Sequence, residues 1–579
     1  MIPALQPDAH GFHGLLSASK AIQVDEIPRS PGLWQTTQDF DFKECGAPRR
    51  NRTADPIITN DVLYQLSYRG TAAGLRESGK PRKAAVSAAF FRRRTAIEAG
   101  MSTALALLPL LLVLVLLASG RTSALTAGIA GLAATVAVSG ANGALLMREV
   151  PAGLWLSWTV ISIIAAGMFF HRCTLARGAP AAGDEAITPR RLWAVCFLLA
   201  PFSEAVTGFG VGYIIALAAL LRLGLGGIPA LLFGLYSQSL VPWGALATGT
   251  TVGATLAGLT ANQLGLATAT LQVPTHVFYL LLYWRFARDS KIVVPAAQKI
   301  DDALWTALLL ALVWLANRYA DAEIAAAAPC AFLLALRFWR GDWQDGGWQE
   351  KGRPDLAHLR RAIVDNAPYV ALTLALCATR LVPPLRDFLK PLWALRPYAN
   401  QPSFAPLYAP GFYLVTIGVV AVLAARASLG QVLRDTVRSA WRSCAVTLAF
   451  VVMAELYVGS GMAQRIAEAL HAAAGHGAVI GVPLFGAMGG FLTGGGSAGN
   501  AMLMPMVIAL ARTVAVDPTW VAAVQNAVCT NLTMLSPIRV TMGLAILALA
   551  MPDSALYRRA WPLALPSLVT GVAAILLIL

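Results

Sequence analysis

Long apolar runs alternate with short polar connections along nearly the whole chain after residue 100. A helix that crosses a bilayer needs about 20 mainly apolar residues, and the chain offers roughly 12 to 14 runs that approach this length. Several runs, among them 192–202 and 211–223, are too short to cross alone. The pattern predicts an all-α polytopic membrane protein in which some segments are broken helices or re-entrant hairpins.

Two stretches of the chain, 202–246 and 490–537, repeat one order of features. Each has a glycine-rich break, a short apolar helix that ends in an arginine, and a proline that begins a second apolar helix. These prolines, Pro229 and Pro518, are 289 positions apart. Polar side chains interrupt the second helix of each stretch, and they are Ser237, Gln238 and Ser239 in the first and Gln525, Asn526, Thr530, Asn531 and Thr533 in the second. We therefore expect two repeated halves.

The first hundred residues differ in kind, because they are polar and lack hydrophobic periodicity. Within them, Gly46 to Gly70 resembles the antisense translation of a transfer-RNA gene, with both arms in the right order. We expect residues 1–100 to be an over-extended gene start or a disordered basic tail. The remaining expected parts are a first half at 101–300, connecting transmembrane helices with a cytoplasmic loop at 301–430, and a second half at 431–579.

Composition agrees with a membrane protein, since 57% of the residues are hydrophobic and only 13% are charged, against about 25% charged in soluble domains. The net charge of +15 could indicate nucleic acid, but the basic residues lie between the apolar runs. Such loops are typically cytoplasmic, and the basic connections are 172–191, 285–299, 353–361 and 426–442. This predicts a bacterial inner-membrane protein with its residue-101 end outside and no nucleic-acid partner.

The stretch GFLTGGGSAGNAMLMP at 490–505 places irregular backbone at membrane depth. Such backbone is tolerated there only where it lines a cavity or packs inside protein. The N–H groups at the start of a half-helix can then bind an anion. Alternatively, the glycines only allow close helix packing. Two matched breaks with interleaved polar side chains favour the substrate site of a secondary transporter.

Motifs at these breaks resemble the lactate permease family of monocarboxylate–proton symporters, from about Met101 to the C-terminus. Glu204 with Gly208-Phe209-Gly210 resembles the E-x3-GFG motif of the family, Phe491 to Asn500 its FLTGS…N segment, and Met534 to Pro537 its M-I-S-P element. The resemblance implies a secondary active transporter that moves lactate or glycolate with protons. It implies no cofactor.

The chain also departs from the family pattern, as a divergent member would. Ser237 to Leu240 reads Ser-Gln-Ser-Leu where the family has Asn-Thr-Ala-Pro, and Gly495 to Ser497 reads Gly-Gly-Ser where it has Ser-Asp-Thr. These changes fall in the expected site, so another small organic anion stays open as the substrate. A sodium-coupled version stays open as well, because unwound carbonyls can coordinate a cation.

Two carboxylates within apolar runs, Glu204 and Glu455, are candidates for carrying the proton, since an ionisable group at membrane depth is costly unless functional. Alternatively, Glu204 caps the next half-helix and Glu455 pairs with Arg380. The candidate substrate-binding residues are Gly208, Phe209, Gly210, Ser237, Gln238, Ser497, Asn500, Gln525, Asn531, Ser536 and Arg539. Arg539 and Arg380 could pair with a substrate carboxylate, although arginines near helix ends also snorkel.

Rival classes have less support. His276 could relay protons, but a lone helical histidine is more often structural. A membrane-embedded enzyme or a scaffold would leave the paired breaks unexplained, and we expect no catalytic residues. The chain has no HExxH zinc motif and no Walker A sequence. Its seven cysteines lie apart without metal-ligand spacing, so we expect no metal. The sequence carries no signal for an oligomeric state.

Overall fold

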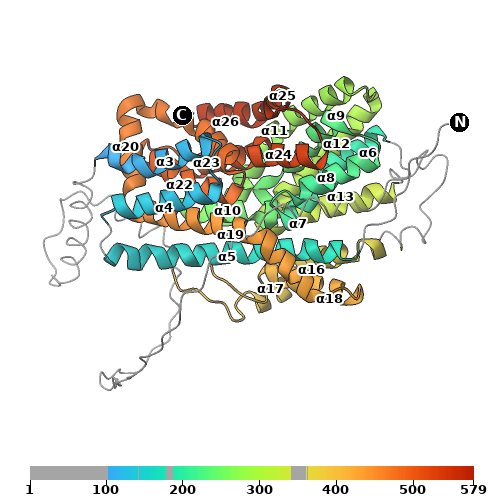
Figure 1. Ribbon diagram of the computed structural model, residues 1–579, viewed down its shortest axis with the longest axis horizontal. Helices are drawn as coiled ribbons and strands as arrows, with labels where there is room; N and C mark the ends of the chain where they lie inside the picture. Colours follow the sequence, from blue (N-terminus) through green and yellow to red (C-terminus); the bar gives the residue numbers. More distant parts are fainter. Residues whose placement is uncertain (1–101, 141–142, 178–186, 341–359, 361–362) are drawn as a thin grey trace, which may run out of the picture. The chain divides into compact units, whose positions relative to one another are not determined.

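The computed structural model describes residues 102–140, 143–177, 187–340, 360 and 363–579. The expectation for residues 1–100 lies outside this part, as does the basic connection 353–361 apart from Arg360. The described part is built from helices and contains no strand (Figure 1).

The described residues from 102 to 340 form helices α3 to α13. Their bounds are Thr103–Ala118 (α3), Ala124–Val138 (α4), Gly143–Leu175 (α5), Pro189–Ala194 (α6), Ala200–Thr207 (α7), Val211–Arg222 (α8), Gly227–Gly234 (α9), Gly244–Ala257 (α10), Ala261–Asp289 (α11), Ala296–Tyr319 (α12) and Ala327–Trp339 (α13).

The described residues from 363 to 579 form helices α16 to α26. Their bounds are Ala367–Leu381 (α16), Pro383–Leu389 (α17), Pro410–Ala424 (α18), Leu429–Gly459 (α19), Met462–Ala474 (α20), Val482–Thr493 (α21), Gly496–Thr513 (α22), Pro518–Leu532 (α23), Pro537–Ile546 (α24), Asp553–Ala560 (α25) and Leu565–Ile578 (α26). Short 3-10 turns join several of them.

Seven of the described helical segments are long and apolar enough to cross a membrane, and the number rises to nine if each of two bent pairs is one span. The pair Gly227–Gln238 and Val241–Ala257 bends by 56°, and the pair Ala367–Leu381 and Pro383–Leu389 bends by 88°. The predicted all-α polytopic class with broken helices is confirmed. The expected count of roughly 12 to 14 segments is reached only when shorter apolar helices are included.

The two repeated stretches share a backbone feature that their sequences do not reveal. A 3-10 turn, Val241–Trp243, precedes Gly244 in the first, and Thr533–Leu535 precedes Ser536 in the second. Both Gly244 and Ser536 have φ −60° and ψ 145°, and each is followed by an α-helix. The second break of each half therefore begins with the same backbone conformation.

Within the first half, three consecutive residues adopt the left-handed conformation. Ala245, Leu246 and Ala247 have φ of 48°, 53° and 63°, and all three are buried. L-residues visit this region singly, at about 1–2 kcal/mol each. A turn of this kind between Trp243 and Thr248 interrupts the chain where α10 starts.

Glycines serve both expected purposes. In α21, a Cβ atom on Gly490 would overlap the Cys529 carbonyl of α23, so this glycine permits close packing. Gly494 ends α21 with φ 67°, and Gly495 is extended with open space around its Cα. Packing and chain breaking are therefore assigned to different glycines within residues 490–500.

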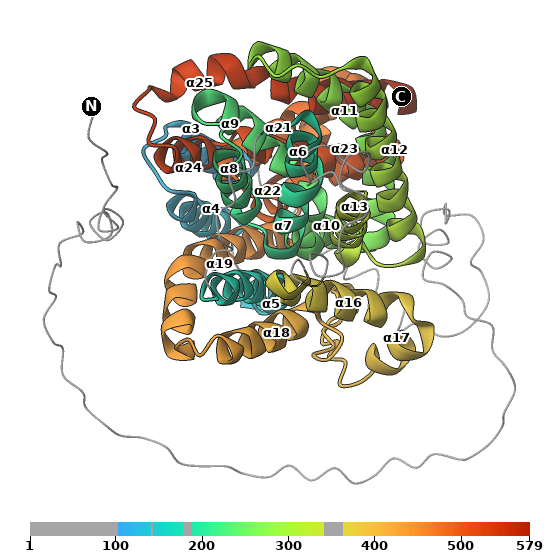
Figure 2. The same ribbon diagram turned by 90° about the vertical axis from the view of Figure 1, so that its right-hand side faces the viewer.

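The basic connections gather at one end of the helices. Arg190 Nε donates to Gln298 Oε1 at 3.2 Å, and Arg337 Nη2 donates to the Arg190 carbonyl at 3.3 Å. At the end of α5, Arg177 Nη2 donates to the Val364 carbonyl at 3.2 Å. Figure 2 views the helices from one end and shows α16 and α18 beside α5, with α17 beyond α16. Which side of the membrane this end faces stays a prediction.

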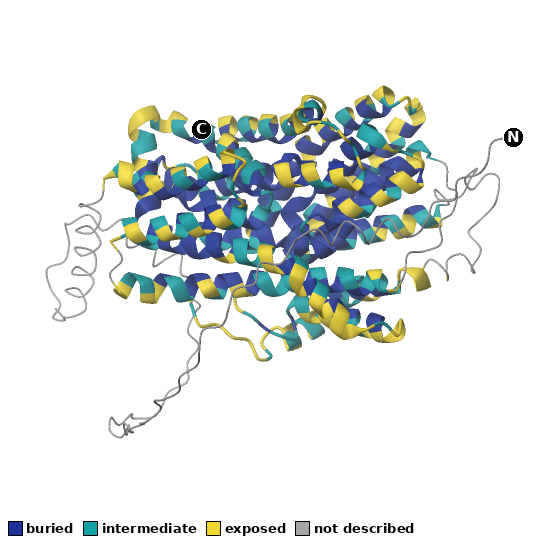
Figure 3. Ribbon diagram, viewed as in Figure 1, coloured by how far each residue is buried: buried dark blue, intermediate teal, exposed yellow. Residues whose placement is uncertain are grey.

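Buried residues occupy the inward-facing parts of the helices, and exposed residues lie mainly on the outer helices and ends (Figure 3). This interior contains many polar groups as well as apolar ones. Uncompensated polar groups are costly in a membrane protein, so the hydrogen bonds of the buried polar side chains locate the candidate site.

Candidate functional site

Glu204 and Arg539 form a buried ion pair that joins the broken segments of the two halves. Arg539 Nη2 lies 3.3 Å from Glu204 Oε1, and the two side chains are 5% and 3% exposed. Glu204 also accepts hydrogen bonds from the backbone N–H of Gly210, at 3.0 Å, and of Gly212, at 3.0 Å. These donors satisfy an ionised carboxylate. The geometry thus contains the capping contact that was the alternative for Glu204.

The Gly208-Phe209-Gly210 break makes this arrangement possible. All three residues have positive φ, of 70°, 56° and 88°. A Cβ atom on Gly210 would overlap Arg539 Nη1, so only glycine allows the guanidinium to lie over this turn. Arg539 Nη1 is buried and has no hydrogen-bond partner in the described structure. One terminal nitrogen of the guanidinium group therefore has no hydrogen-bond acceptor in the described structure.

The second break lies close to the same residues. Ser536 Oγ accepts a hydrogen bond from the Arg539 N–H at 3.4 Å and thereby caps α24. Gly494 lies against the Ser536 side chain and is half-buried, whereas Ile538 is 56% exposed. Ser536 and Arg539 thus place the second break of the second half next to the ion pair.

A polar seam runs between α10 and α22, where both helices begin. Gly249 packs against the backbone of Gly496 and Ser497. The Ser497 hydroxyl donates to Thr248 Oγ1 at 3.4 Å. The N-terminal residue before α22, Gly495, provides no side-chain cap. Two helix starts, one from each half, therefore meet with few side-chain acceptors, which favours an anion nearby.

Asn500 and Asn526 continue this seam toward α11. Asn500 Nδ2 donates to the Gly249 carbonyl at 3.0 Å and to Asn526 Oδ1 at 2.8 Å. Asn526 Nδ2 donates to Thr250 Oγ1 and Thr268 Oγ1, at 3.1 and 3.0 Å. All of these side chains are buried. Asn500 Oδ1 has no partner among the described residues.

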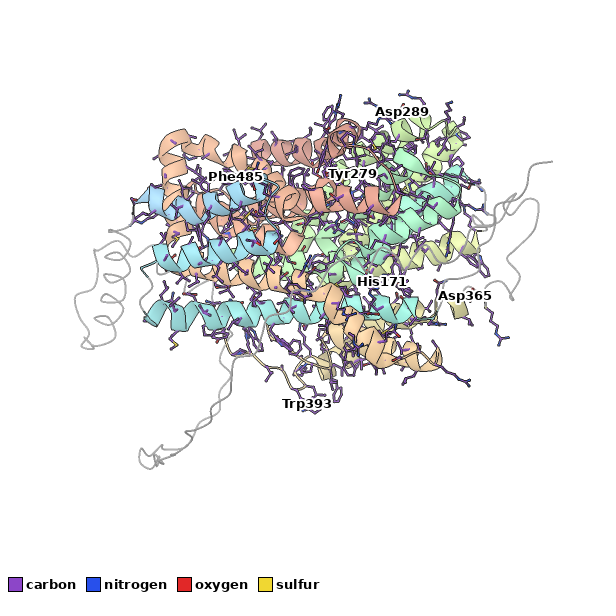
Figure 4. All side chains as sticks on the ribbon, viewed as in Figure 1. His171, Tyr279, Asp289, Asp365, Trp393 and Phe485 are labelled. Atoms are coloured by element: carbon purple, nitrogen blue, oxygen red, sulfur yellow. The ribbon has the colours of Figure 1, made fainter. Side chains whose placement is uncertain are left out.

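A separate network surrounds Asn531. Its amide exchanges hydrogen bonds with that of Gln272 at 3.1 and 3.3 Å, and its Nδ2 also donates to Ser567 Oγ at 3.0 Å. Tyr279, which lies among the helices in Figure 4, contacts the same hydroxyl at 3.1 Å. Every polar group of Asn531 is engaged in this conformation, and these contacts join α11, α23 and α26.

Two predicted residues, Gln238 and Gln525, have fewer contacts than their burial demands. Gln238 Nε2 donates to Ser237 Oγ at 2.9 Å, but Gln238 Oε1 has no partner in the described structure. Gln525 is fully buried, and neither atom of its amide group has a described partner. Buried amides in this state are costly, which favours a ligand or a change of conformation.

Glu455 lies elsewhere. Its Oε1 accepts from Gln401 Nε2 at 2.8 Å, and its side chain packs against Gly153 of α5. Farther along α5, Gly167 packs against Thr207, close to the Gly208 break. Fourteen residues of helix separate these two glycines, or about 21 Å. Glu455 is thus distant from the Glu204–Arg539 pair.

Arg380 does not pair with Glu455. Its Nη2 lies 2.7 Å from Glu323 Oε2 and donates to the Tyr408 carbonyl at 2.6 Å, and its side chain is fully buried. The alternative that paired Arg380 with Glu455 is therefore wrong in this structure. His276 Nδ1 contacts the carbonyl of Gln272 at 2.9 Å, one turn earlier in α11, as a structural histidine would.

Ser497 also falls within a Gly-x-Ser-x-Gly sequence, Gly495 to Gly499. In hydrolases this pattern forms a strand-to-helix turn that exposes a nucleophile to a histidine. Here two helices flank the turn, and no described histidine is hydrogen-bonded to Ser497. The motif provides no catalytic arrangement in the described structure.

Sequence reasoning missed several residues of these networks. Glu149 lies against Gly459, one turn from Glu455, and pairs with Arg148. The other missed residues are Thr248, Thr250, Thr268, Gln272 and Ser567. The threonines of α10 directly follow the second break of the first half, and this position relative to the break was the available signal.

Paired broken helices that meet at a buried polar centre are typical of membrane transport proteins. The sequence profile described as L-lactate permease matches residues 102–579. The chain therefore belongs to the L-lactate permease family, and the predicted resemblance is confirmed.

Two proteins are similar to this chain at low sequence identity. A curated L-lactate permease of Streptococcus iniae is 22% identical over 387 residues, which cover 63% of this chain and 80% of that protein. A solved structure of MtrF from Neisseria gonorrhoeae, described as one of a class of antimetabolite efflux pumps, aligns over 74% of this chain and 83% of its own. It has 13% identity and a TM-score of 0.37.

Proposed function

We propose that this chain is a secondary active transporter that moves a small monocarboxylate, lactate or glycolate, together with protons. The observation that carries this proposal is the buried Glu204–Arg539 pair, with Arg539 Nη1 unused. A guanidinium can bind a carboxylate through two parallel hydrogen bonds. Arg539 is therefore the proposed counter-ion of the substrate carboxylate.

Charge balance supplies the reason for coupling. One guanidinium neutralises one carboxylate, and Glu204 is the carboxylate beside Arg539 in this structure. A substrate carboxylate adds a second negative charge to a buried site, and an uncompensated buried charge is strongly unfavourable. A proton on Glu204 removes that charge and frees Arg539 for the substrate. Glu204 is thus proposed to exchange its ion pair for the transported proton.

The remaining predicted residues are proposed to line the path or hold the substrate. They are Gly208, Phe209, Gly210, Ser237, Gln238, Ser497, Asn500, Gln525, Asn531 and Ser536. Glu455 stays a second proposed proton-coupling residue, at a distance from Arg539.

The test is uptake of labelled lactate and glycolate into proteoliposomes, with and without an inward proton gradient. We expect gradient-driven accumulation by the natural sequence. Glu204→Gln should lose this accumulation but retain exchange of internal for external substrate, because glutamine removes the proton site and leaves Arg539 available. Arg539→Gln should lose both activities.

Two outcomes would contradict the proposal. Accumulation that depends on sodium and does not depend on the proton gradient would show that sodium is the coupling ion. Full proton-driven uptake by Glu204→Gln would remove Glu204 from coupling and leave Glu455 as the residue to replace.

We also propose that the protein lies in the bacterial inner membrane with its residue-101 end outside. Ser119 and Ala394 are exposed in connections that this topology places on opposite sides, inside and outside respectively. Trp393, the neighbour of Ala394, lies at the edge of the helices in Figure 4. An impermeant thiol reagent added to whole spheroplasts should label Ala394→Cys and leave Ser119→Cys unlabelled. The reverse labelling would invert the topology.

A further inference from the structure

A cavity of about 400 Å³ lies where α11 ends and α12 begins. Four cationic side chains line it, together with one aromatic and several aliphatic residues. The cations are Arg285, Arg288, Lys291 and Lys299, and the other lining residues are Leu281, Trp284, Ile292, Val293 and Val294. The cavity belongs to neither broken segment, so the proposed transport function does not use it.

The charges in this cavity are poorly neutralised. Asp289 lies 3.9 Å from the Nε atoms of Arg285 and Arg288, beyond hydrogen-bond length. Figure 4 shows Asp289 at the outer edge of the helices. The next carboxylate along the chain, Asp301, is held by both terminal nitrogens of Arg340 at 2.7 Å. Of the described carboxylates, Asp289 therefore lies within 4 Å of these cations, and Asp302 nearby accepts from neutral donors, which favours an anionic ligand.

Trp284 is held in a fixed orientation at the cavity. Its Nε1 donates to Asp302 Oδ2 at 3.1 Å, and Gln298 Nε2 donates to the other carboxylate oxygen at 2.6 Å. Lys299 lies over the Trp284 ring, with Nζ 5.8 Å from the ring centroid. Tryptophan prefers the level of lipid headgroups. The cavity thus has a rigid aromatic wall at the end of an apolar helix.

Two apolar stripes lead from this cavity along the outer surface. On α11, Val273, Val277 and Leu281 follow one another at four-residue spacing up to Arg285, and they are 45%, 55% and 52% exposed. On α12, Ile300 and Leu304 are 63% and 65% exposed. Residues four apart share one face of a helix. Each stripe offers an acyl chain a continuous surface.

We propose that this cavity binds the phosphate headgroup of an anionic phospholipid, with its acyl chains along the two stripes. Basic pockets between membrane helices recognise such headgroups. The cations contact the phosphate, Trp284 packs against the glycerol region, and the stripes explain why a lipid is favoured over a free anion. Each basic residue contributes about 1 kcal/mol, or about fivefold in affinity.

The test uses the purified full chain, delipidated in a neutral detergent, with thermal unfolding as the readout. Phosphatidylglycerol and cardiolipin should raise the midpoint of unfolding, whereas phosphatidylcholine at equal concentration should not. Replacing Arg285, Arg288, Lys291 and Lys299 by glutamine should abolish this shift. Single replacements, Arg285→Gln or Lys299→Gln, should each weaken lipid retention in native mass spectrometry about fivefold, which keeps the test valid if the fourfold variant fails to fold.

A matched control removes four charges from the connection before α19 and the first part of this helix. Val432 there packs with Cys173 near the end of α5, so this segment lies at the same basic end. The control replaces Arg426, Arg434, Arg438 and Arg442 by glutamine, and it should keep the lipid-induced shift. Loss of the lipid-induced shift in this control would show that the lipid binds through the overall positive charge of this surface and not through the cavity, and would overturn the proposal.

Two further arms separate a lipid from a free anion. Inorganic phosphate at the same concentration as the lipid should not change the midpoint of thermal unfolding. A shift equal to that given by the lipid would show that the cavity binds a free phosphate ion and would overturn the lipid proposal. Leu281→Gln should weaken retention of long-chain phosphatidylglycerol more than that of a short-chain form. If Leu281→Gln weakened retention of the long-chain and short-chain forms equally, the acyl chains would not lie along the α11 stripe, and this part of the proposal would be wrong.

Discussion

Arg539 Nη2 and Glu204 Oε1 lie 3.3 Å apart although 335 positions separate the two residues in the chain. This pair is the direct charged link between the broken segments of the two halves. Both members are buried, so each depends on the other for compensation. Any rearrangement that separates the halves at this point must supply a new partner for each charge.

Removing both members of this pair should cost less than the two single removals added together. Glu204→Gln or Arg539→Gln alone leaves an unpaired buried group, and we expect a loss of about 3–5 kcal/mol. The double variant should be less destabilised than the sum of the single variants, by about 1–3 kcal/mol. Thermal unfolding of the four proteins in detergent measures this coupling. Strictly additive effects would show that the pair is not formed.

Gly210→Ala should destabilise the first break. A residue other than glycine at φ 88° is strained by at least about 1–2 kcal/mol, and the added methyl group must also displace Arg539. We expect a lower midpoint of thermal unfolding and loss of lactate uptake. The control is Gly430→Ala in the first turn of α19, where a Cβ atom meets open space, and its midpoint should be unchanged or slightly higher.

Two glycines of one motif should respond differently to alanine. Gly490→Ala pushes a methyl group into the Cys529 carbonyl, and overpacking of this kind costs about 1–3 kcal/mol. Gly495 has φ −145° and open space around its Cα, so Gly495→Ala should fold normally. Unfolding midpoints of the two variants decide the matter. Equal losses would mean that both glycines serve packing.

Arg380→Gln should strongly lower stability, because it leaves Glu323 without its guanidinium and removes a side chain that is 0% exposed. We expect a cost of about 3–5 kcal/mol. The matched control is Arg386→Gln, which breaks the exposed pair with Asp387 and should leave the unfolding midpoint unchanged. Normal stability of Arg380→Gln would return Arg380 to the set of substrate-binding candidates.

The positions of the breaks could be predicted because they depend on local chemistry. Glycines at 208, 210, 494 and 495 lower the stability of a helix, and the proline at 537 favours the start of a new one. The class of protein followed from the length of the apolar runs. Both signals are contained in short stretches of sequence, so no knowledge of the tertiary contacts was needed.

The partners of the polar residues could not be predicted in this way. Glu204 with Arg539, and Asn531 with Gln272, join helices that are far apart in the chain. Nothing in the sequence around Arg380 distinguishes a buried partner of Glu323 from an arginine at the membrane surface. The left-handed turn was hidden too, because alanine and leucine are ordinary helix formers.

That turn has a consequence for which substitutions the chain tolerates. Ala245, Leu246 and Ala247 form a left-handed turn, in the opposite sense to the right-handed helices. The residues tolerated at these positions therefore depend on the cost of a positive φ and not on helix propensity. Ala245 also lies against Gly208, where a second methyl group would come within 2.5 Å. A saturation library at these codons should therefore return glycine and asparagine, and should lose valine and isoleucine, whose branched Cβ atoms resist a left-handed coil.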